Sequence, residues 1–372
     1  MTRHSIPVGR VFGISIGLDY SWFLIFVLFT WALAANYFPA AYPGWPRAEY
    51  WILGAASAFM LFVCVLLHEL GHSVVAMRYR ISVRSITLFL FGGVSQIEGE
   101  PPSAGAEFWI AIAGPAVSGA LAVIFALIRP AVAGVPPLSA LTTYLAYING
   151  ALAVFNLIPG FPLDGGRVLR AILWGSTRSF RKATLVAATV GRIVAFIFIV
   201  WGVAQVFSGR LGDGLWILFI GWFLENAASA QVQQQVVGSL LAGHTVSEAM
   251  NPHYVSVPAA TDLQNLVDRH ILGSGNRTVM VMRDGEVAGL VTVHQVAGVP
   301  RDRWPTTTVG EAMTPITRVK RIKPSAGLWE AMMEMDHEGV NQLPVMENGG
   351  IVGMLTRADI IGYLRTLQEL GR

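Results

Sequence analysis

Long apolar runs dominate the first 240 residues of the chain. Six segments reach the roughly 20 mostly apolar residues that a membrane-spanning helix needs, at about 18–38, 51–77, 106–128, 138–158, 187–207 and 212–230. The N-terminal stretch lacks a short apolar segment ending in a small-residue cleavage site, so the first run is expected to be an uncleaved span. The pattern predicts a polytopic α-helical membrane protein with about six transmembrane helices.

The stretch 81–99 (ISVRSITLFLFGGVSQIEG) is apolar but too short and too broken to cross a bilayer as a helix. Its β-type residues flank Gly92 and Gly93, which favours a hairpin. An open strand edge is tolerated at membrane depth only where the backbone is buried in protein or lines a cavity. We therefore expect a re-entrant β-hairpin packed on the helical bundle. The alternative is a plain surface loop.

Charged residues are few and unevenly distributed. They make up 13% of the chain, against about 25% in typical soluble domains. Residues 1–240 hold 23 of them, whereas the 132 residues from 241 onward hold 26. This break predicts a membrane-embedded domain over 1–235 and a soluble tail after it. The net charge of +3 is too small to indicate nucleic acid as a partner.

Basic residues gather on one set of the loops between the predicted spans. That set carries ten and the opposite set three; the ten are Arg3, Arg10, Arg78, Arg80, Arg84, Arg167, Arg170, Arg178, Arg181 and Lys182. Cytoplasmic loops are enriched in Lys and Arg. We therefore expect a multi-pass protein of the cell membrane whose N-terminus and tail are cytoplasmic.

The tail contains an internal repeat. TVSEAMNPHYVSVP at 245–258 aligns with TVGEAMTPITRVKR at 308–321, and each is followed by a helical stretch and a short β pattern. Repetition at a fixed spacing indicates two copies of one supersecondary unit. The sequence thus predicts a C-terminal α/β domain pair, with one copy over 245–300 and the other over 308–368.

Candidate chemistry lies in the second predicted span, where His68, Glu69 and His72 form HELGH. Two histidines four apart lie on one helix face, a turn from each other. This is the spacing for two imidazoles on one zinc ion, with the intervening glutamate as a general base. Ionisable residues inside a membrane are costly and mark functional sites. The alternative is a helix end at the interface with hydrogen-bonded histidines.

A catalytic zinc ion needs a third protein ligand and an open position for water. Asp164 follows the fourth predicted span in NLIPGFPLDGG. The prolines and glycines around it, Gly165 and Gly166 included, are expected to prevent a regular helix, so that the carboxylate can turn toward a metal. A turn-capping role for Asp164 is equally compatible with the Asp-Gly pair.

Three motifs together resemble the site-2 protease family, M50-type zinc metalloproteases that cut membrane-embedded substrates. They are HELGH, Phe-Gly-Gly at 91–93, and N-x-x-P-x-x-x-x-D-G-G over 156–166. The resemblance covers about 18–230. It implies that His68, His72 and Asp164 bind Zn²⁺, that Glu69 is the base, and that Asn156 is a polar partner of the substrate or of the oxyanion.

The same resemblance implies the kind of substrate. Gly92 and Gly93 resemble the loop that receives an extended substrate strand, and an edge strand at 86–97 could hold it by β-addition. It implies that the substrates are single-pass membrane proteins, cut in or near the bilayer in regulated intramembrane proteolysis such as the release of an anti-sigma factor.

The repeated tail resembles a pair of CBS domains, a family that often binds adenosine nucleotides between its two copies. The nucleotide signature of that family, Gly-x-x-Thr-x-x-Asp, is complete in the second copy at Gly353, Thr356 and Asp359. The first copy has Gln295 where the Asp would stand. The resemblance therefore implies at most one nucleotide site, and a role in homodimerisation or packing is the alternative.

Three functions from different classes are consistent with the sequence. The first is an intramembrane zinc protease regulated through the CBS pair. The second is a metal transporter in which His68 and His72 are transit ligands. The third is a non-catalytic membrane binding protein. A transporter has no need of Glu69 between the histidines, and an inactive protein would be expected to have lost a ligand or the base.

Overall fold

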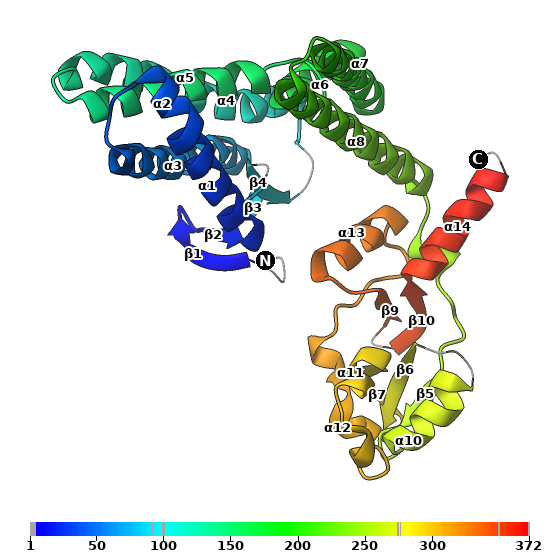
Figure 1. Cartoon of the computed structure of the whole chain (residues 1–372). Helices are drawn as coiled ribbons and strands as arrows, with labels where there is room; N and C mark the ends of the chain where they lie inside the picture. Colours follow the sequence, from blue (N-terminus) through cyan, green and yellow to red (C-terminus); the bar gives the residue numbers. More distant parts are fainter. Residues whose placement is uncertain are drawn as a thin grey trace. The chain divides into compact units, whose positions relative to one another are not determined.

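The computed structural model describes residues 5–90, 92–98, 101–273, 275, 277–348 and 350–370. The chain divides into two compact units, Met1–Gln233 and Gln234–Arg372 (Figure 1). The first contains the long apolar helices and the second the repeated tail.

The long helices confirm the predicted membrane protein. Among the described residues, six helical segments are long and apolar enough to cross a membrane: Tyr20–Ala41, Arg47–Arg78, Ala104–Val132, Pro136–Asn156, Phe180–Phe207 and Leu211–Leu241. The first is α1 (Tyr20–Ala32), continued through a π turn into α2 (Phe38–Ala41). The others are α3 (Arg47–Arg78), α4 (Ala104–Ile128), α5 (Pro136–Asn156), α7 (Phe180–Phe207) and α8 (Leu211–Leu241).

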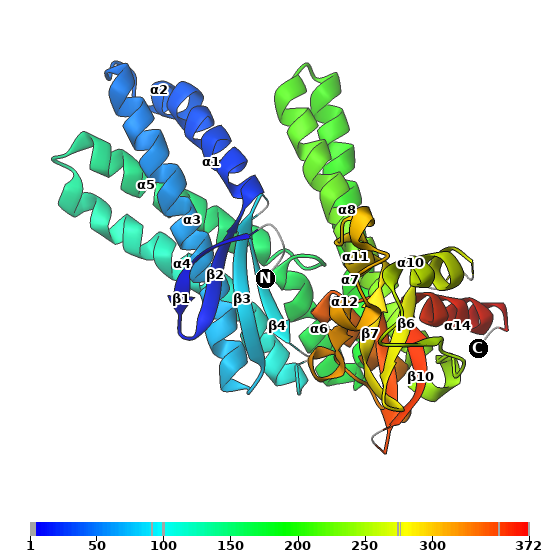
Figure 2. The ribbon, with the colours of Figure 1, turned by 90° about the horizontal axis from the view of Figure 1, so that it is seen from below.

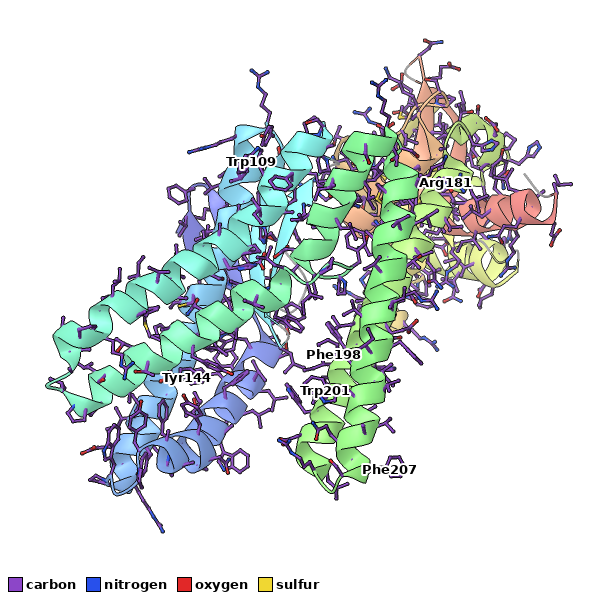
Figure 3. The ribbon with its side chains drawn as sticks, turned by 90° about the horizontal axis from the view of Figure 1, so that it is seen from above. Trp109, Tyr144, Arg181, Phe198, Trp201 and Phe207 are labelled. Atoms are coloured by element: carbon purple, nitrogen blue, oxygen red, sulfur yellow. The ribbon has the colours of Figure 1, made fainter. Side chains whose placement is uncertain are left out.

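Several helices extend beyond the apolar runs that predicted them. Helix α7 begins at Phe180, seven residues before the predicted start, because Ser179 caps its first turn by accepting a hydrogen bond from the Lys182 N–H. Figure 3 shows Arg181 near this end of α7 and Phe207 at the other. Charged residues at such a helix end can lie at the membrane surface while the apolar core of the helix crosses the lipid.

A four-stranded sheet accompanies the helices of the first unit. Its strands are β1 (Ser5–Val11), β2 (Ile14–Asp19), β3 (Ser82–Phe89) and β4 (Gly92–Glu98), in that order, with β2 and β3 parallel and the other pairs antiparallel. Figure 2 shows the four strands side by side. Ile14 and Ile86 pack against Leu70 of α3. The sheet therefore lies against the helix that carries HELGH.

The sheet corresponds only in part to the sequence analysis. β3 and β4 form the hairpin expected over 81–99, whereas its re-entrant position in a membrane stays a prediction. The hairpin β1–β2 was not predicted. Its turn is Phe12-Gly13, and both residues have positive φ, 51° and 82°. Phenylalanine is an uncommon residue at such a turn, where Asn or Asp is usual before Gly, so the turn signal was missed.

A seventh helix, α6 (Asp164–Thr177), is too short to span a bilayer. The chain enters it from α5 through the irregular segment 157–163, in which the Phe161–Pro162 peptide bond is cis. This segment packs closely on α7, since a Cβ at Gly191 would meet the backbone of Phe161. The position of α6 is thereby fixed at its N-terminal end.

The second unit contains the two copies of the repeat. The first includes β5 (Ser256–Pro258), α10 (Leu263–Asn265), β6 (Thr278–Arg283), β7 (Glu286–Thr292) and α11 (Val293–Ala297). The second includes α13 (Leu328–Glu338), β9 (Gln342–Glu347), β10 (Gly350–Thr356) and α14 (Arg357–Glu369). The short elements α9 (Val246–Ala249), α12 (Val309–Ala312) and β8 (Thr314–Pro315) belong to the segments that open each copy.

The opening segments are exchanged between the copies. Val246 of the first copy is buried in a core with Leu328, Leu343 and Leu355 of the second. Val309 of the second copy is buried among residues of the first copy, such as Val281. The two copies therefore complete each other's hydrophobic cores, as expected of one cooperative α/β domain pair.

Candidate metal centre

Helix α3 brings His68 and His72 to one face, as their spacing predicts. Both side chains are buried, with 4% of each residue exposed. Their Nε2 atoms lie 3.2 Å apart, and the rings meet edge to face with centroids 4.9 Å apart. Two imidazole nitrogens therefore point at a common position inside the protein.

Asp164 brings a carboxylate to the same position from a different part of the chain. Its Oδ2 lies 3.1 Å from Nε2 of His68 and 3.2 Å from Nε2 of His72. The three residues form one of two groups of potential metal ligands among the described residues; the other, Glu334, His337 and Glu338, is partly or fully exposed. Asp164 is partly buried, so the complete set is shielded from bulk solvent.

The local backbone around Asp164 differs from the expectation in one respect. Asp164 is the first residue of α6, and Gly165 and Gly166 lie inside this helix, so they do not prevent it. The glycines serve close packing instead. A Cβ at Gly165 would meet the carbonyls of Leu157 and Ile158, and one at Gly166 would meet the backbone of Gly160 and Phe161. The irregular segment 157–163 and the first turn of α6 can thus lie in contact.

Helix α4 supplies the outer contacts of both histidines. Nδ1 of His72 lies 2.7 Å from the Ile110 carbonyl, and Nδ1 of His68 lies 2.8 Å from Oγ of Ser118. Gly114 lies between these two positions, and a Cβ there would collide with both Nε2 atoms. Contacts of this kind fix the tautomer and the orientation of metal-binding histidines.

The three inner atoms fit a divalent cation. A carbonyl oxygen only accepts hydrogen bonds, so Nδ1 of His72 must carry a proton, and in the neutral ring Nε2 then presents a lone pair. That lone pair faces a carboxylate oxygen and a second imidazole nitrogen. Ligand atoms of a tetrahedral zinc site, with bonds of about 2.0–2.1 Å, lie about 3.3 Å apart. The observed separations of 3.1–3.2 Å are close to this value.

Glu69 lies beside the three ligand candidates and contacts strand β4. Its Oε2 accepts a hydrogen bond of 2.7 Å from Oγ of Ser95. A Cβ at Gly93 would come within 3.3 Å of Oε1 and still nearer to the Glu69 stem. Gly93, which the sequence predicted to be functional, is therefore a glycine for a structural reason: the lack of a side chain allows the edge strand of the sheet to reach the Glu69 carboxylate.

The other two residues singled out in the membrane part lie at element ends. Gly92 is the first residue of β4 and has a φ of 128°, a conformation that side chains rarely adopt. Asn156 is the last residue of α5 and is partly exposed. It stands eight positions before Asp164, at the start of the irregular segment.

Sequence reasoning missed the residues that hold this centre together. Gly114, Ser118 and Ser95 have no motif of their own. Their contacts with the HELGH residues join positions 26 to 50 apart in the chain. A buried glutamate, Glu107 of α4, also forms an ion pair with Arg170 of α6. In the sequence, the only signal for this pair is the acidic side chain of Glu107 within an apolar helix.

In the second unit, Thr356 and Asp359 form a helix cap. The Thr356 N–H donates to Oδ2 of Asp359 at 2.8 Å, and the Asp359 N–H donates to Oγ1 of Thr356 at 3.2 Å. Thr292 and Gln295 form the same reciprocal pair in the first copy, at 2.7 and 3.4 Å. Both copies thus begin a helix with a capping box, which Gln295 completes in the first copy and Asp359 in the second.

Comparisons with known proteins identify related families. The family described as Peptidase family M50 matches residues 56–143 and 131–200, and the CBS domain family matches residues 307–366. Rip3 of Mycobacterium tuberculosis, which bears the name of a zinc metalloprotease, is 38% identical over 363 residues; these cover 96% of this chain and 92% of Rip3. A second relative so named, sll0528 of Synechocystis, is 34% identical and covers 98% of this chain and 96% of its own.

Solved structures match each unit separately. The site-2 protease from Methanocaldococcus jannaschii is 30% identical, with a TM-score of 0.42, and covers 62% of this chain and 95% of its own. CBSX2, solved in complex with AMP, is 22% identical, with a TM-score of 0.29, and covers 35% of this chain and all of its own.

Proposed function

This chain belongs to peptidase family M50 and is a multi-pass membrane zinc metalloprotease, and we propose that His68, His72 and Asp164 hold its zinc ion. The observation that carries this proposal is the convergence of two Nε2 atoms and one Oδ2 atom within 3.1–3.2 Å of one another. When bound, zinc supplies the Lewis acidity that activates water and polarises a peptide carbonyl.

Glu69 is the general base in this proposal. It accepts a proton from the attacking water and passes it to the departing amine nitrogen. Ser95 already donates to Oε2, so Oε1 is the oxygen that carries the proton. Asn156 donates a hydrogen bond to the developing oxyanion, a contact worth roughly 3 kcal/mol when it is fully formed.

The substrate adds to strand β4 in an extended conformation. β4 is the last strand of the sheet order β1-β2-β3-β4, so its outer edge offers backbone donors and acceptors. Gly92 and Gly93 have no side chains, so they leave this edge accessible to a substrate strand, and Gly93 lies against Glu69. Single-pass membrane proteins fit this arrangement, because a spanning helix that unwinds locally presents an extended strand near the bilayer.

The basic residues support a proposed orientation in the membrane. Arg78, at the end of α3, lies six positions after His72, and Arg181 lies in the first turn of α7. Cytoplasmic enrichment of such residues supports the proposal that the catalytic centre lies near the cytoplasmic face and the CBS pair in the cytoplasm. The CBS pair regulates the protease or its assembly as a homodimer, and it binds an adenine nucleotide through Thr356 and Asp359.

The metal content of purified protein tests the ligand set. The wild-type protein in detergent should contain about one zinc ion per chain, and Asp164→Ala should lose or weaken it. If Asp164→Ala retains zinc with unchanged affinity, the third ligand is wrongly assigned. A transporter would show uptake of metal into vesicles without cleavage of a membrane substrate. The Glu69 carboxylate beside the site favours hydrolysis over transport.

A further inference from the structure

One buried face of α4 carries the residues that contact the two histidines of the metal centre. Ile110, Gly114 and Ser118 contact the two histidines. Glu107 stands one turn earlier on the same face and is fully buried. Because residues three, seven and eleven positions apart share a helix face, α4 presents these four residues as one stripe.

Glu107 connects this stripe to the helix that begins with Asp164. Its Oε1 forms a close ion pair with Arg170, six positions after Asp164 on α6, and lies 3.9 Å from Nε of Arg167. The guanidinium of Arg170 also lies 5.0 Å from the ring centroid of Phe161 and 4.6 Å from that of Phe180. Arg170 thus joins α4, the irregular segment before α6 and the start of α7.

An ion pair of this kind is a poor source of stability. Transfer of two charges from water costs several kcal/mol per ion, and replacing a buried pair with apolar residues of similar volume is often neutral or stabilising. Moreover, Oε2 of Glu107 is buried without a hydrogen-bond partner among the described residues. The pair therefore serves to fix geometry, because a directional charged pair defines the relative position of two helices better than apolar contacts do.

We infer that the Glu107–Arg170 pair is a positioning clamp for the metal centre. It fixes the register of α6 against α4, and so sets Oδ2 of Asp164 relative to the two Nε2 atoms that α4 orients. The inference rests on the proposed ligand role of Asp164. Neither residue of the clamp touches substrate or metal, so both are positioning residues and not catalytic ones.

A double apolar replacement separates positioning from stability. The variant Glu107→Met with Arg170→Met removes both charges of the pair together; Arg167, whose Nε lies 3.9 Å from Oε1 of Glu107, is the one other cation that loses this carboxylate among the described ion pairs. The control is Arg192→Met with Glu225→Met, which removes a more exposed Arg–Glu pair between helices of the same unit, with N and O atoms 3.4 Å apart. For each full-length protein in detergent, zinc affinity is measured by competition with a chelator, and thermal unfolding is measured after the metal is removed.

The clamp predicts weaker zinc binding without loss of fold. Changes in the outer contacts of a metal site typically cost 10–100-fold in affinity, and we expect a loss in this range for the Glu107/Arg170 double variant, with metal-free unfolding at the wild-type temperature. The control pair should bind zinc normally. Wild-type zinc affinity in the Glu107/Arg170 variant would overturn the clamp, provided that Asp164→Ala loses zinc. If Asp164→Ala retains zinc, the ligand assignment itself fails.

A conservative variant covers the case in which the double variant does not fold. Glu107→Gln keeps the size of the side chain and an acceptor for Arg170, but removes the charge. With Co²⁺ in place of zinc, the visible absorption bands report the geometry of the ligands independently of activity. We expect altered bands and weaker Co²⁺ binding in Glu107→Gln. Bands and affinity identical to those of the wild type would contradict the inference.

Discussion

The hydroxyl of Ser95 donates a hydrogen bond to Oε2 of Glu69 at 2.7 Å, and thereby joins the edge strand of the sheet to the carboxylate between the two histidines. Ser95 and Gly93 are two positions apart on β4, so they face the same side. In the proposed reaction, a substrate strand that pairs with β4 lies beside the residue that orients the base.

Removal of this hydroxyl should slow the chemical step. A hydrogen bond to a charged group contributes about 1.5–3 kcal/mol, so Ser95→Ala should lower kcat about tenfold or more while KM changes little. Ser95→Thr retains the hydroxyl and should recover most of the activity. Cleavage kinetics on a single-pass substrate check this, and an unchanged kcat in Ser95→Ala would mean that Ser95 does not orient the base.

Gly114 leaves the space that the two histidines occupy. A Cβ at this position would collide with both Nε2 atoms, so Gly114→Ala should displace the rings and lower zinc content well below one per chain. Gly119→Ala is the control on the same helix, because a Cβ there meets nothing within 4 Å. Equal zinc content in the two variants would refute this account of Gly114.

In the CBS pair, the residue at one position of the first copy is a suitable substitution at the equivalent position of the second copy. Gln295 caps its helix in the first copy as Asp359 does in the second. Asp359→Gln should therefore preserve the cap and the thermal stability, but remove the carboxylate proposed to bind the nucleotide. We expect AMP binding to weaken about 10–100-fold, the equivalent of one charge-assisted contact. The proposed site is wrong if calorimetry finds equal AMP affinity in both proteins.

Stability of the second unit should depend on pH through Glu248. Hydrogen bonds from Tyr363 and His244, with a further one from the Thr245 N–H, lower the pKa of Glu248 to about 2 from its ordinary 4.5. A lowered carboxyl pKa stabilises the folded state above pH 4.5, and this contribution is lost as pH falls toward 2.

Glu248→Gln measures this contribution. Its unfolding temperature should lie below that of the wild type at pH 7, and the difference should shrink as pH falls from about 4.5 toward 2. The same difference at every pH would show that the carboxylate charge is not involved. Because Glu248 is partly exposed, added salt should also reduce the difference.

The sequence predicted what depends on spacing within a single element. Six apolar runs gave the six spans, and the interval of four in HELGH put His68 and His72 on one face. The repeat predicted the α/β pair. Asp164 could be linked to the histidines only through a family resemblance, because 92 residues separate it from His72 and its own surroundings were compatible with a simple cap.

The missed features depend on contacts between distant elements. Ser118 meets His68 across 50 residues, and Glu107 meets Arg170 across 63. Nothing local in the sequence distinguishes Ser118 from other polar residues in a helix, and Glu107 is marked only as an acid in an apolar helix. The hairpin β1–β2 was missed for a different reason, since Phe12-Gly13 is an unusual pair for a tight turn.

The central claim is that Glu69 performs proton transfer at a metal site built from His68, His72 and Asp164. The most direct test is Glu69→Gln, assayed for zinc content and for cleavage of a single-pass membrane substrate in the same preparation. We predict about one zinc ion per chain, as in the wild type, and cleavage reduced to background. Cleavage at the wild-type rate by zinc-loaded Glu69→Gln would contradict the account.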